Sequence, residues 1–183
     1  MRRLPQVAAV AVVLALLGVL VWHVASGGGG KVAKEVDSGH IYPAPPFTRS
    51  LVNADGKLSL ASLRGKVVVL NFWQSYCAPC THEAPTLAAA SKRWAKNKDV
   101  VFVGVDVQDF RSNGRKFLAR FGISYPNVAD DGSLVGHYGV TGYPETFFID
   151  RRGRVVPIAQ VGHIVGPATA AKINEGIRQA FTA

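Results

Sequence analysis

The chain has 183 residues, a formal net charge of +9 and only two cysteines, Cys77 and Cys80. Two cysteines exclude a four-thiolate zinc site and a small scaffold held by several disulfides. The basic residues are scattered rather than clustered, so a basic surface near anionic lipid heads or an acidic partner explains the charge better than nucleic-acid binding does.

The N-terminal segment has the composition of a membrane anchor. After Arg2 and Arg3, residues 7–25 contain no formally charged side chain, and about 17–25 apolar residues suffice to span a bilayer. The positive-inside rule keeps the two arginines in the cytoplasm, so we expect a single-pass protein of the plasma (inner) membrane whose C-terminal domain faces the periplasm or extracytoplasmic side. A small-residue site at 24–26 leaves a cleaved signal peptide as the alternative. Residues 1–26 are assigned to this segment.

Glycine and proline dominate the next segment. Residues 27–46 begin with four consecutive glycines and end with three closely spaced prolines, which predicts a flexible linker and irregular structure up to Pro46. Residues 47–183 then form one domain, large enough for a sheet with helices on both faces.

The first half of this domain predicts a hairpin, a strand and a helix. A turn signal at 53–57 lies between short apolar stretches and indicates a β-hairpin. The continuous apolar run 67–73 is typical of a strand buried on both faces. A helix is expected from about residue 78 to 96, with a kink at Pro85 because proline removes one backbone donor.

The second half adds further strands and helices. A second buried strand at 100–105 precedes two short helices, and a hairpin then leads to a closing amphipathic helix that starts after Pro167. The helices are expected at 112–121 and 134–138, and the hairpin strands at 146–150 and 155–161. This order predicts an α/β fold with a central mixed β-sheet flanked by helices.

The two cysteines are expected to form one reactive pair. Cys77 falls at the junction of a strand and a helix, where unpaired backbone N–H groups and the helix dipole favour a thiolate. We therefore expect Cys77 to be the attacking nucleophile and Cys80, one turn into the helix, to displace the resulting mixed disulfide. This chemistry needs no metal and no cofactor. Two unreactive buried cysteines, or half of a metal site, are the alternatives.

Glu83 is the candidate proton-handling group. It follows Cys80 by three residues and shares a helix face with it. A nearby negative charge disfavours a second one on sulfur, so this carboxylate can hold or relay the proton that thiol exchange must move. A solvated surface glutamate is the alternative.

Three segments together resemble the thioredoxin superfamily. Residues 71–80, 83–85 and 142–150 follow that family's order and spacing, and the Pro-Glu-Thr-Phe-x-Ile-Asp run is similar to the membrane-tethered TlpA/ResA/CcmG (DsbE) branch. The resemblance covers nearly all of the chain from about Phe47. It implies a thioredoxin fold with an N-terminal hairpin and with a strand–helix insertion over residues 106–138.

The resemblance also implies a substrate site. Pro144 would be the family's cis-proline, which faces the cysteine pair and helps to dock an extended substrate strand. Trp73, Tyr76 and Tyr143 are the other expected substrate contacts, although Tyr76 stands where the family usually has tryptophan. Because Asn71 replaces the aspartate of cytosolic thioredoxin, proton handling is assigned to Glu83.

The function implied by the resemblance is a membrane-anchored reductant of cytochrome c maturation. It would reduce disulfides in apocytochrome c and be recharged by a membrane electron donor of the DsbD/CcdA type. One alternative is an oxidant that donates its disulfide to folding secreted proteins. Another is a Cu(I)-binding metallochaperone module that uses the two thiolates and His82. Asp106 and Asp109 are expected to be turn or cap residues after a strand.

Overall fold

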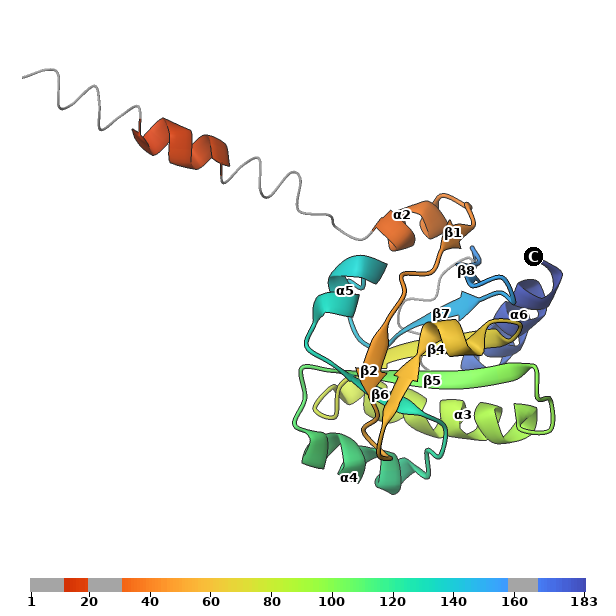
Figure 1. Ribbon diagram of the computed structural model, residues 1–183. Coiled ribbons are helices and arrows are strands. Elements are labelled where there is room, and N and C mark those ends of the chain that lie inside the picture. The colour runs from red at the N-terminus through yellow and green to blue at the C-terminus, as the bar shows by residue number, and fades with distance from the viewer. Residues whose placement is uncertain (1–11, 20–30, 158–167) are drawn as a thin grey trace, which may run out of the picture.

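A computed structural model describes residues 12–19, 31–157 and 168–183. Its centre is a six-stranded sheet in the order β1-β8-β7-β4-β5-β6 (Figure 1). The strands β4, β5 and β6 are parallel, whereas β7 runs antiparallel to β4. The expected central sheet of mixed direction is therefore confirmed. The strands are β1 (Tyr42–Pro43), β4 (Val67–Trp73), β5 (Val100–Val107), β6 (Asn127–Asp130), β7 (Glu145–Ile149) and β8 (Arg154–Val155).

The strand β4 lies in the middle of the sheet and every one of its residues is buried. Its side chains alternate between two hydrophobic clusters, because successive residues of a strand point to opposite faces. Val67 and Val69 belong to one cluster, and Val68, Leu70 and Phe72 to the other. The apolar run in the sequence is continuous because both faces of this strand are covered.

Helices cover both faces of the sheet (Figure 1). The helices α3 (Ala78–Trp94) and α6 (Ala168–Thr182) pack on one face, and α2 (Lys31–Asp37) and α5 (Ser133–Tyr138) pack on the other. The helix α4 (Arg111–Phe121) lies against α3. As predicted, Ile173 and Ile177 of α6 are buried together, and Gly122 ends α4 in the left-handed conformation at φ 62°.

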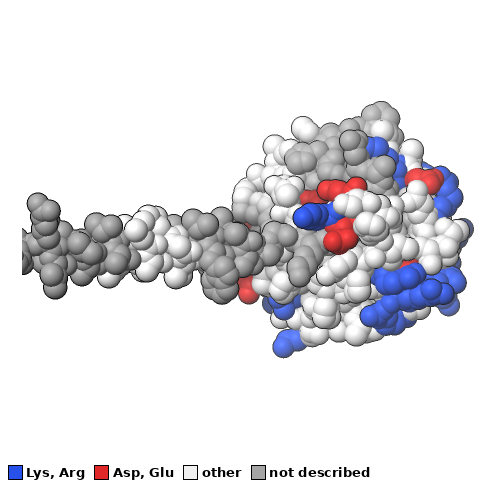
Figure 2. Space-filling view, turned by 90° about the horizontal axis from the view of Figure 1, so that it is seen from above, with Lys and Arg blue, Asp and Glu red and all other residues white. Residues whose placement is uncertain are grey.

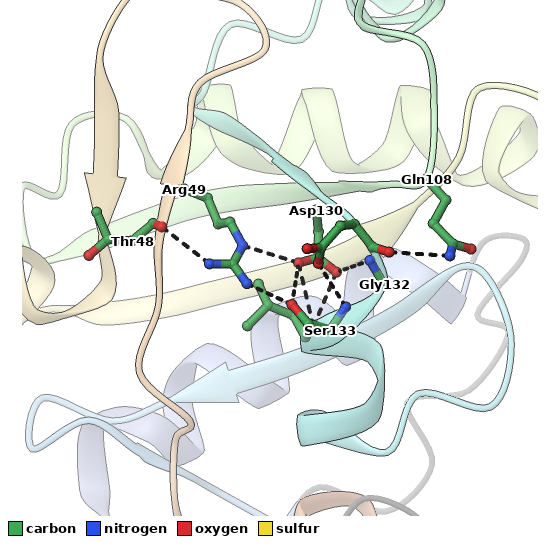
Figure 3. Close-up of polar contacts among 8 residues, drawn as sticks. Thr48, Arg49, Gln108, Asp130, Gly132 and Ser133 are labelled. Atoms are coloured by element: carbon green, nitrogen blue, oxygen red, sulfur yellow. Dashed lines mark hydrogen bonds and ion pairs between the residues drawn. The ribbon is translucent and has the colours of Figure 1, made fainter.

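The expected N-terminal hairpin is present as β2 (Thr48–Ser50) and β3 (Lys57–Ser59), followed by the 3₁₀ helix η1 (Leu60–Leu63). Arg49 of β2 donates from Nε to Asp130 at 3.3 Å and from a terminal nitrogen to Ser133 at 2.6 Å (Figure 3). Asp130 also accepts from the backbone N–H groups of Gly132 and Leu134. These bonds hold the hairpin against the start of α5.

Several predicted element boundaries differ from those of the structure. The helix α3 ends at Trp94, and β8 ends at Val155, with residues 158–161 outside the described ranges. The expectation of irregular structure up to Pro46 also fails, because α2 and β1 lie in that segment. Tertiary contacts outweigh the local composition there: Val32 is buried beside α5, and β1 pairs with β8.

Most of the expected membrane span, residues 7–25, lies outside the described ranges. Residues 12–19 are helical. Within the part of the chain that is described, no helix is both long and apolar enough to cross a membrane. The anchor and its orientation stay predictions.

Candidate active site

Cys77 and Cys80 form a disulfide at the carboxyl end of β4, with their Cα atoms 5.2 Å apart. Cys77 is the N-cap of α3, and Pro79 lies in the helix's first turn. The sulfur of Cys77 accepts a hydrogen bond from the backbone N–H of Cys80 at 3.1 Å. In the reduced protein this donor and the start of the helix would favour a thiolate on Cys77.

The two sulfurs differ in their access to solvent. Cys77 is partly exposed, whereas Cys80 retains only 2% of its accessible surface. Attack on a protein disulfide requires contact with a bulky partner, which Cys77 permits and Cys80 does not. The geometry therefore fits Cys77 as the nucleophile and Cys80 as the resolving thiol.

Glu83 lies one turn after Cys80 on α3 and is only 4% exposed. The alternative of a solvated surface glutamate is thus excluded. Burial raises the pKa of Glu83 to about 7, although the hydrogen bond from Asn71 partly opposes this shift. A carboxyl group with this pKa can take up or release a proton near neutral pH.

Asn71 is a site residue whose role the sequence did not reveal. Its side-chain nitrogen donates to Glu83 at 3.1 Å and to Thr146 on β7 at 2.9 Å. One signal for it was available, since Asn71 is the only polar residue in the apolar run of β4. The amide joins the proton-handling helix to two neighbouring strands.

Cys80, Glu83 and Asn71 line one small cavity beneath the disulfide. The other lining residues are Trp73, Ala84, Leu87, Phe117, Ile123 and Tyr125. The lining therefore contains one carboxyl group and no lysine, arginine or histidine. Burial, and then the charge of Glu83, raises the pKa of Tyr125, so this phenol remains protonated.

The segment around Pro144 faces the disulfide from the start of β7. The Tyr143–Pro144 peptide bond is cis, as the resemblance implies. The carbonyl oxygen of Tyr143 lies 3.5 Å from the sulfur of Cys77. Pro144 is buried and Tyr143 is half-buried. The backbone of this segment is thus placed beside the reacting sulfur, and its docking role stays a prediction.

The expected substrate contacts differ in exposure. Tyr76 is 66% exposed next to Cys77 and is available to a partner. Trp73 is only 3% exposed, so its assignment as a substrate contact is wrong. Its ring stacks on Phe117 with centroids 4.6 Å apart, and its indole N–H donates to Asn127 at 3.0 Å. Trp73 belongs to the core beneath the site.

Gly104 explains how the indole of Trp73 fits there. A Cβ atom at this position would lie 1.7 Å from Oδ1 of Asn127 and 2.8 Å from the indole nitrogen. The Trp73–Asn127 hydrogen bond therefore passes over a strand residue that must lack a side chain.

The expectation that Asp106 is a turn or cap residue is also wrong. This residue lies within β5, opposite Trp73 on β4, and is 2% exposed. Asp109 does lie in the following loop, where it accepts from the backbone N–H of Ser75 at 2.8 Å. Because β5 is buried on both faces, the carboxyl group of Asp106 lies inside the protein.

Little in the described structure supports a metal site. His82 is exposed on α3, and the two cysteine sulfurs are bonded to each other. No group of three or more histidine, cysteine, aspartate or glutamate residues able to hold a metal occurs in the described ranges.

On the face seen from above, acidic and basic side chains lie close together near the middle, and basic ones gather at one edge (Figure 2).

The comparison with protein families matches the AhpC/TSA family over residues 42–158, which is more than half of the chain. The chain belongs to the AhpC/TSA family. This match covers β1, the redox-active strand and helix, and the strand that follows Pro144.

Named relatives define the chemistry more closely. The chain is 30% identical over 166 residues to the thiol-disulfide oxidoreductase ResA of Bacillus subtilis, covering 90% of this chain and 85% of that protein. It is 35% identical over 137 residues to the thiol:disulfide interchange protein HelX of Rhodobacter capsulatus, covering 73% and 72%. A thioredoxin family thiol:disulfide interchange protein from Chlorobium tepidum superposes with a TM-score of 0.65 at 32% identity, covering 77% of this chain and 97% of that one.

These relatives and the Cys77–Cys80 disulfide identify the protein as an enzyme, a thiol–disulfide oxidoreductase with a thioredoxin fold. The resemblance to the ResA and DsbE branch is confirmed.

Proposed function

We propose that this oxidoreductase is a membrane-anchored, extracytoplasmic reductant of protein disulfides that acts in cytochrome c maturation. Its substrate would be the oxidised haem-attachment site of apocytochrome c, and a membrane donor of the DsbD/CcdA type would return its electrons. The resemblance to the membrane-tethered branch supports this substrate and this donor. The uncharged N-terminal run behind Arg2 and Arg3 supports the anchor.

The observation that carries the direction of electron flow is the lining of the cavity below Cys80. A strongly oxidising pair has a stabilised reduced form, and a cation beside a cysteine is one way to stabilise its thiolate. Here the cavity holds the carboxyl group of Glu83 and no cationic side chain. A negative charge this close to the pair disfavours the thiolate that Cys77 carries in the reduced enzyme and so favours the disulfide of the enzyme. Such an enzyme gives its electrons away readily.

The reaction begins at Cys77. Its thiolate attacks one sulfur of the substrate disulfide, forming a Cys77–substrate disulfide, and the second substrate sulfur leaves as a thiolate. The N–H of Cys80, 3.1 Å from the Cys77 sulfur, and the start of α3 favour the attacking thiolate. The exposed ring of Tyr76 and the backbone at Tyr143 lie where the substrate chain would pass.

Cys80 completes the reaction. Its thiol transfers a proton to the carboxylate of Glu83, and the resulting thiolate attacks the sulfur of Cys77. The Cys77–Cys80 disulfide forms, the substrate sulfur leaves as a thiolate, and that thiolate takes a proton from solvent. Two electrons thereby pass from the enzyme to the substrate. Glu83 suits this step because its pKa of about 7 allows it to be ionised before the step and protonated after it.

The test uses the full chain in its reduced form and an oxidised apocytochrome c. We expect stoichiometric reduction of the haem-attachment disulfide. The Cys80→Ser variant is expected to accumulate a mixed disulfide through Cys77, whereas Cys77→Ser forms none. Failure to reduce apocytochrome c while another protein disulfide is reduced would contradict the proposed substrate.

A separate experiment tests the membrane anchor. The full chain is expected to stay with the membrane fraction after alkaline carbonate extraction, and a chain that begins at residue 27 is expected to be released. Release of both forms would contradict a retained anchor and would favour the cleaved signal peptide.

A further inference from the structure

Two side-chain hydrogen bonds join the loop that carries Cys77 to the loop that follows β5. The side chain of Gln74 donates to the carbonyl of Val107 at 3.2 Å. The backbone N–H of Ser75 donates to Oδ2 of Asp109 at 2.8 Å. Because β4 and β5 are parallel neighbours, their following loops meet at the same edge of the sheet. The chain segment that leads from β4 to Cys77 is thus held by a loop outside the redox motif.

This second loop is itself held firmly. Gln108 has a φ of 48°, the one positive φ among the described residues other than glycine. Its backbone N–H donates to the carbonyl of Asp130 at 2.8 Å, and its side chain donates to the carbonyl of Asp131 at 3.2 Å (Figure 3). A residue in this conformation persists where its surroundings hold it. These contacts direct the next residue, Asp109, toward Ser75.

A buried carboxyl group, Asp106, lies beside Asp109. Its neighbours across the sheet are Trp73 on β4 and Ala129 on β6, which carry no charge. Gly114 of α4 packs on it so closely that a Cβ atom there would lie 2.1 Å from Oδ2 of Asp106. Asp109 is the charged group that acts on it.

The protonation of Asp106 depends on its neighbour Asp109. Burial, and then the charge and hydrogen bond of Asp109, raise the pKa of Asp106 to about 8, so Asp106 is protonated at pH 7. The Oδ1 atoms of both residues are buried without a hydrogen-bond partner among the described residues. A buried pair of this kind is stable when one proton lies between the two groups.

We propose that Asp109 is a positioning residue of the redox loop and that Asp106 holds Asp109 in place. Asp109 accepts the Ser75 N–H through Oδ2, and the proton of Asp106 lies between the two carboxyl groups. Ser75 precedes Cys77 by two residues, so this bond keeps the cysteine at the N-cap of α3, where the Cys80 N–H reaches its sulfur. Ionisation of Asp106 places a second anion in the buried pair, and repulsion then weakens the hold on Ser75.

The first test follows the backbone amide of Ser75 by ¹H–¹⁵N NMR in the oxidised protein from pH 5 to pH 9.5. We expect its resonance to move with a midpoint at about pH 8, the pKa of Asp106. The Asp106→Asn variant keeps a neutral donor of nearly the same shape and is expected to abolish this step. A Ser75 resonance that does not titrate there, or that titrates equally in Asp106→Asn, would overturn the proposal.

The second test measures alkylation of Cys77 by iodoacetamide in the reduced protein at pH 7. Asp109→Ala removes the acceptor of the Ser75 hydrogen bond and is expected to slow alkylation about tenfold, equivalent to one pKa unit of the thiol. Asp109→Asn keeps an acceptor oxygen and is expected to recover most of the rate. Asp55→Asn removes one charge from the exposed β2–β3 turn and serves as the control. Wild-type alkylation in a folded Asp109→Ala would refute the positioning role. If Asp109→Ala does not fold, the Ser75 titration decides. Neither readout involves a protein substrate, so failure of the cytochrome c proposal would leave this one standing.

Discussion

Asn71 on β4 donates its side-chain amide to the buried carboxyl group of Glu83 on α3 at 3.1 Å. The bond places a hydrogen-bond donor, rather than a positive charge, beside the acid that shares a cavity with Cys80. A donor of this kind moderates the effect of burial without keeping the carboxyl group ionised at all pH values. Glu83 can therefore change its protonation state while the enzyme turns over.

Replacement of Glu83 by glutamine is expected to slow the second half of the exchange reaction. The amide cannot accept the proton of Cys80, so resolution of the mixed disulfide is expected to fall about 100-fold, the lower end of what general acid–base catalysis supplies. Attack by Cys77 keeps its rate. Acid-quenched time courses with mass spectrometry separate the two steps.

The matched control for this experiment is Glu175→Gln. Glu175 is a partly exposed acid on α6, paired with Arg178, and its replacement is expected to leave both steps unchanged. Equal slowing of the two steps in Glu83→Gln would contradict proton transfer from Cys80.

Glu83 also makes stability depend on pH. The folded protein keeps a proton on this group up to a pH of about 7, whereas the unfolded chain releases it near the ordinary glutamate pKa of 4.5. The folded state therefore binds more protons between these values, and the free energy of unfolding falls as the pH rises through them and levels off above 7. The change is about 3 kcal/mol for this group.

Urea denaturation of the wild type and of Glu83→Gln at pH 4.5 and pH 8 measures this effect. The variant lacks the titrating group, so its stability relative to the wild type is expected to rise by about 3 kcal/mol over this interval. Parallel stability curves would show that Glu83 has an ordinary pKa in the folded protein.

Replacement of Asn71 by alanine is expected to move the pH optimum of exchange upward. Its hydrogen bond lowers the pKa of Glu83, so its loss raises that pKa above about 7. The ionised form that accepts the proton of Cys80 then appears at higher pH. A pH–rate profile of the resolution step tests this, and an unchanged profile would separate Asn71 from proton handling.

The two aromatic residues beside the site are expected to respond oppositely to mutation. Trp73→Phe leaves the buried Oδ1 of Asn127 without its indole donor, which costs about 1–3 kcal/mol of stability, while exchange by the folded protein persists. Tyr76→Ala is expected to leave stability unchanged and to raise the KM for a protein substrate, since this ring is 66% exposed. A raised KM in Trp73→Phe would restore Trp73 as a substrate contact.

The sequence was sufficient to predict the sheet, the hairpin and the reactive pair. Continuous apolar runs and turn residues are local signals, and the strand at 67–73 agrees with β4 at both ends. The resemblance added the cis bond before Pro144. The resemblance also assigned Trp73 to the substrate site. This assignment failed because proximity to Cys77 in the sequence does not reveal whether a side chain points toward a partner or into the core.

What escaped prediction depends on contacts between distant residues. The helix α2 forms in a segment rich in glycine and proline because Val32 is buried beside α5. The link from Asn71 to Glu83 spans 12 residues, and that from Ser75 to Asp109 spans 34. The sequence predicted a turn or cap position for Asp106, because an aspartate inside a buried strand is rare unless it has a partner.

The equilibrium redox potential of the Cys77–Cys80 couple tests the central claim most directly. Equilibration of the purified protein in dithiothreitol and glutathione buffers is expected to give a value near the thioredoxin end of the family, about −270 mV, because the acidic cavity disfavours the reduced form. Glu83→Gln is expected to shift it toward less negative values. A potential near −120 mV, typical of the oxidant DsbA, would contradict the proposed reductant.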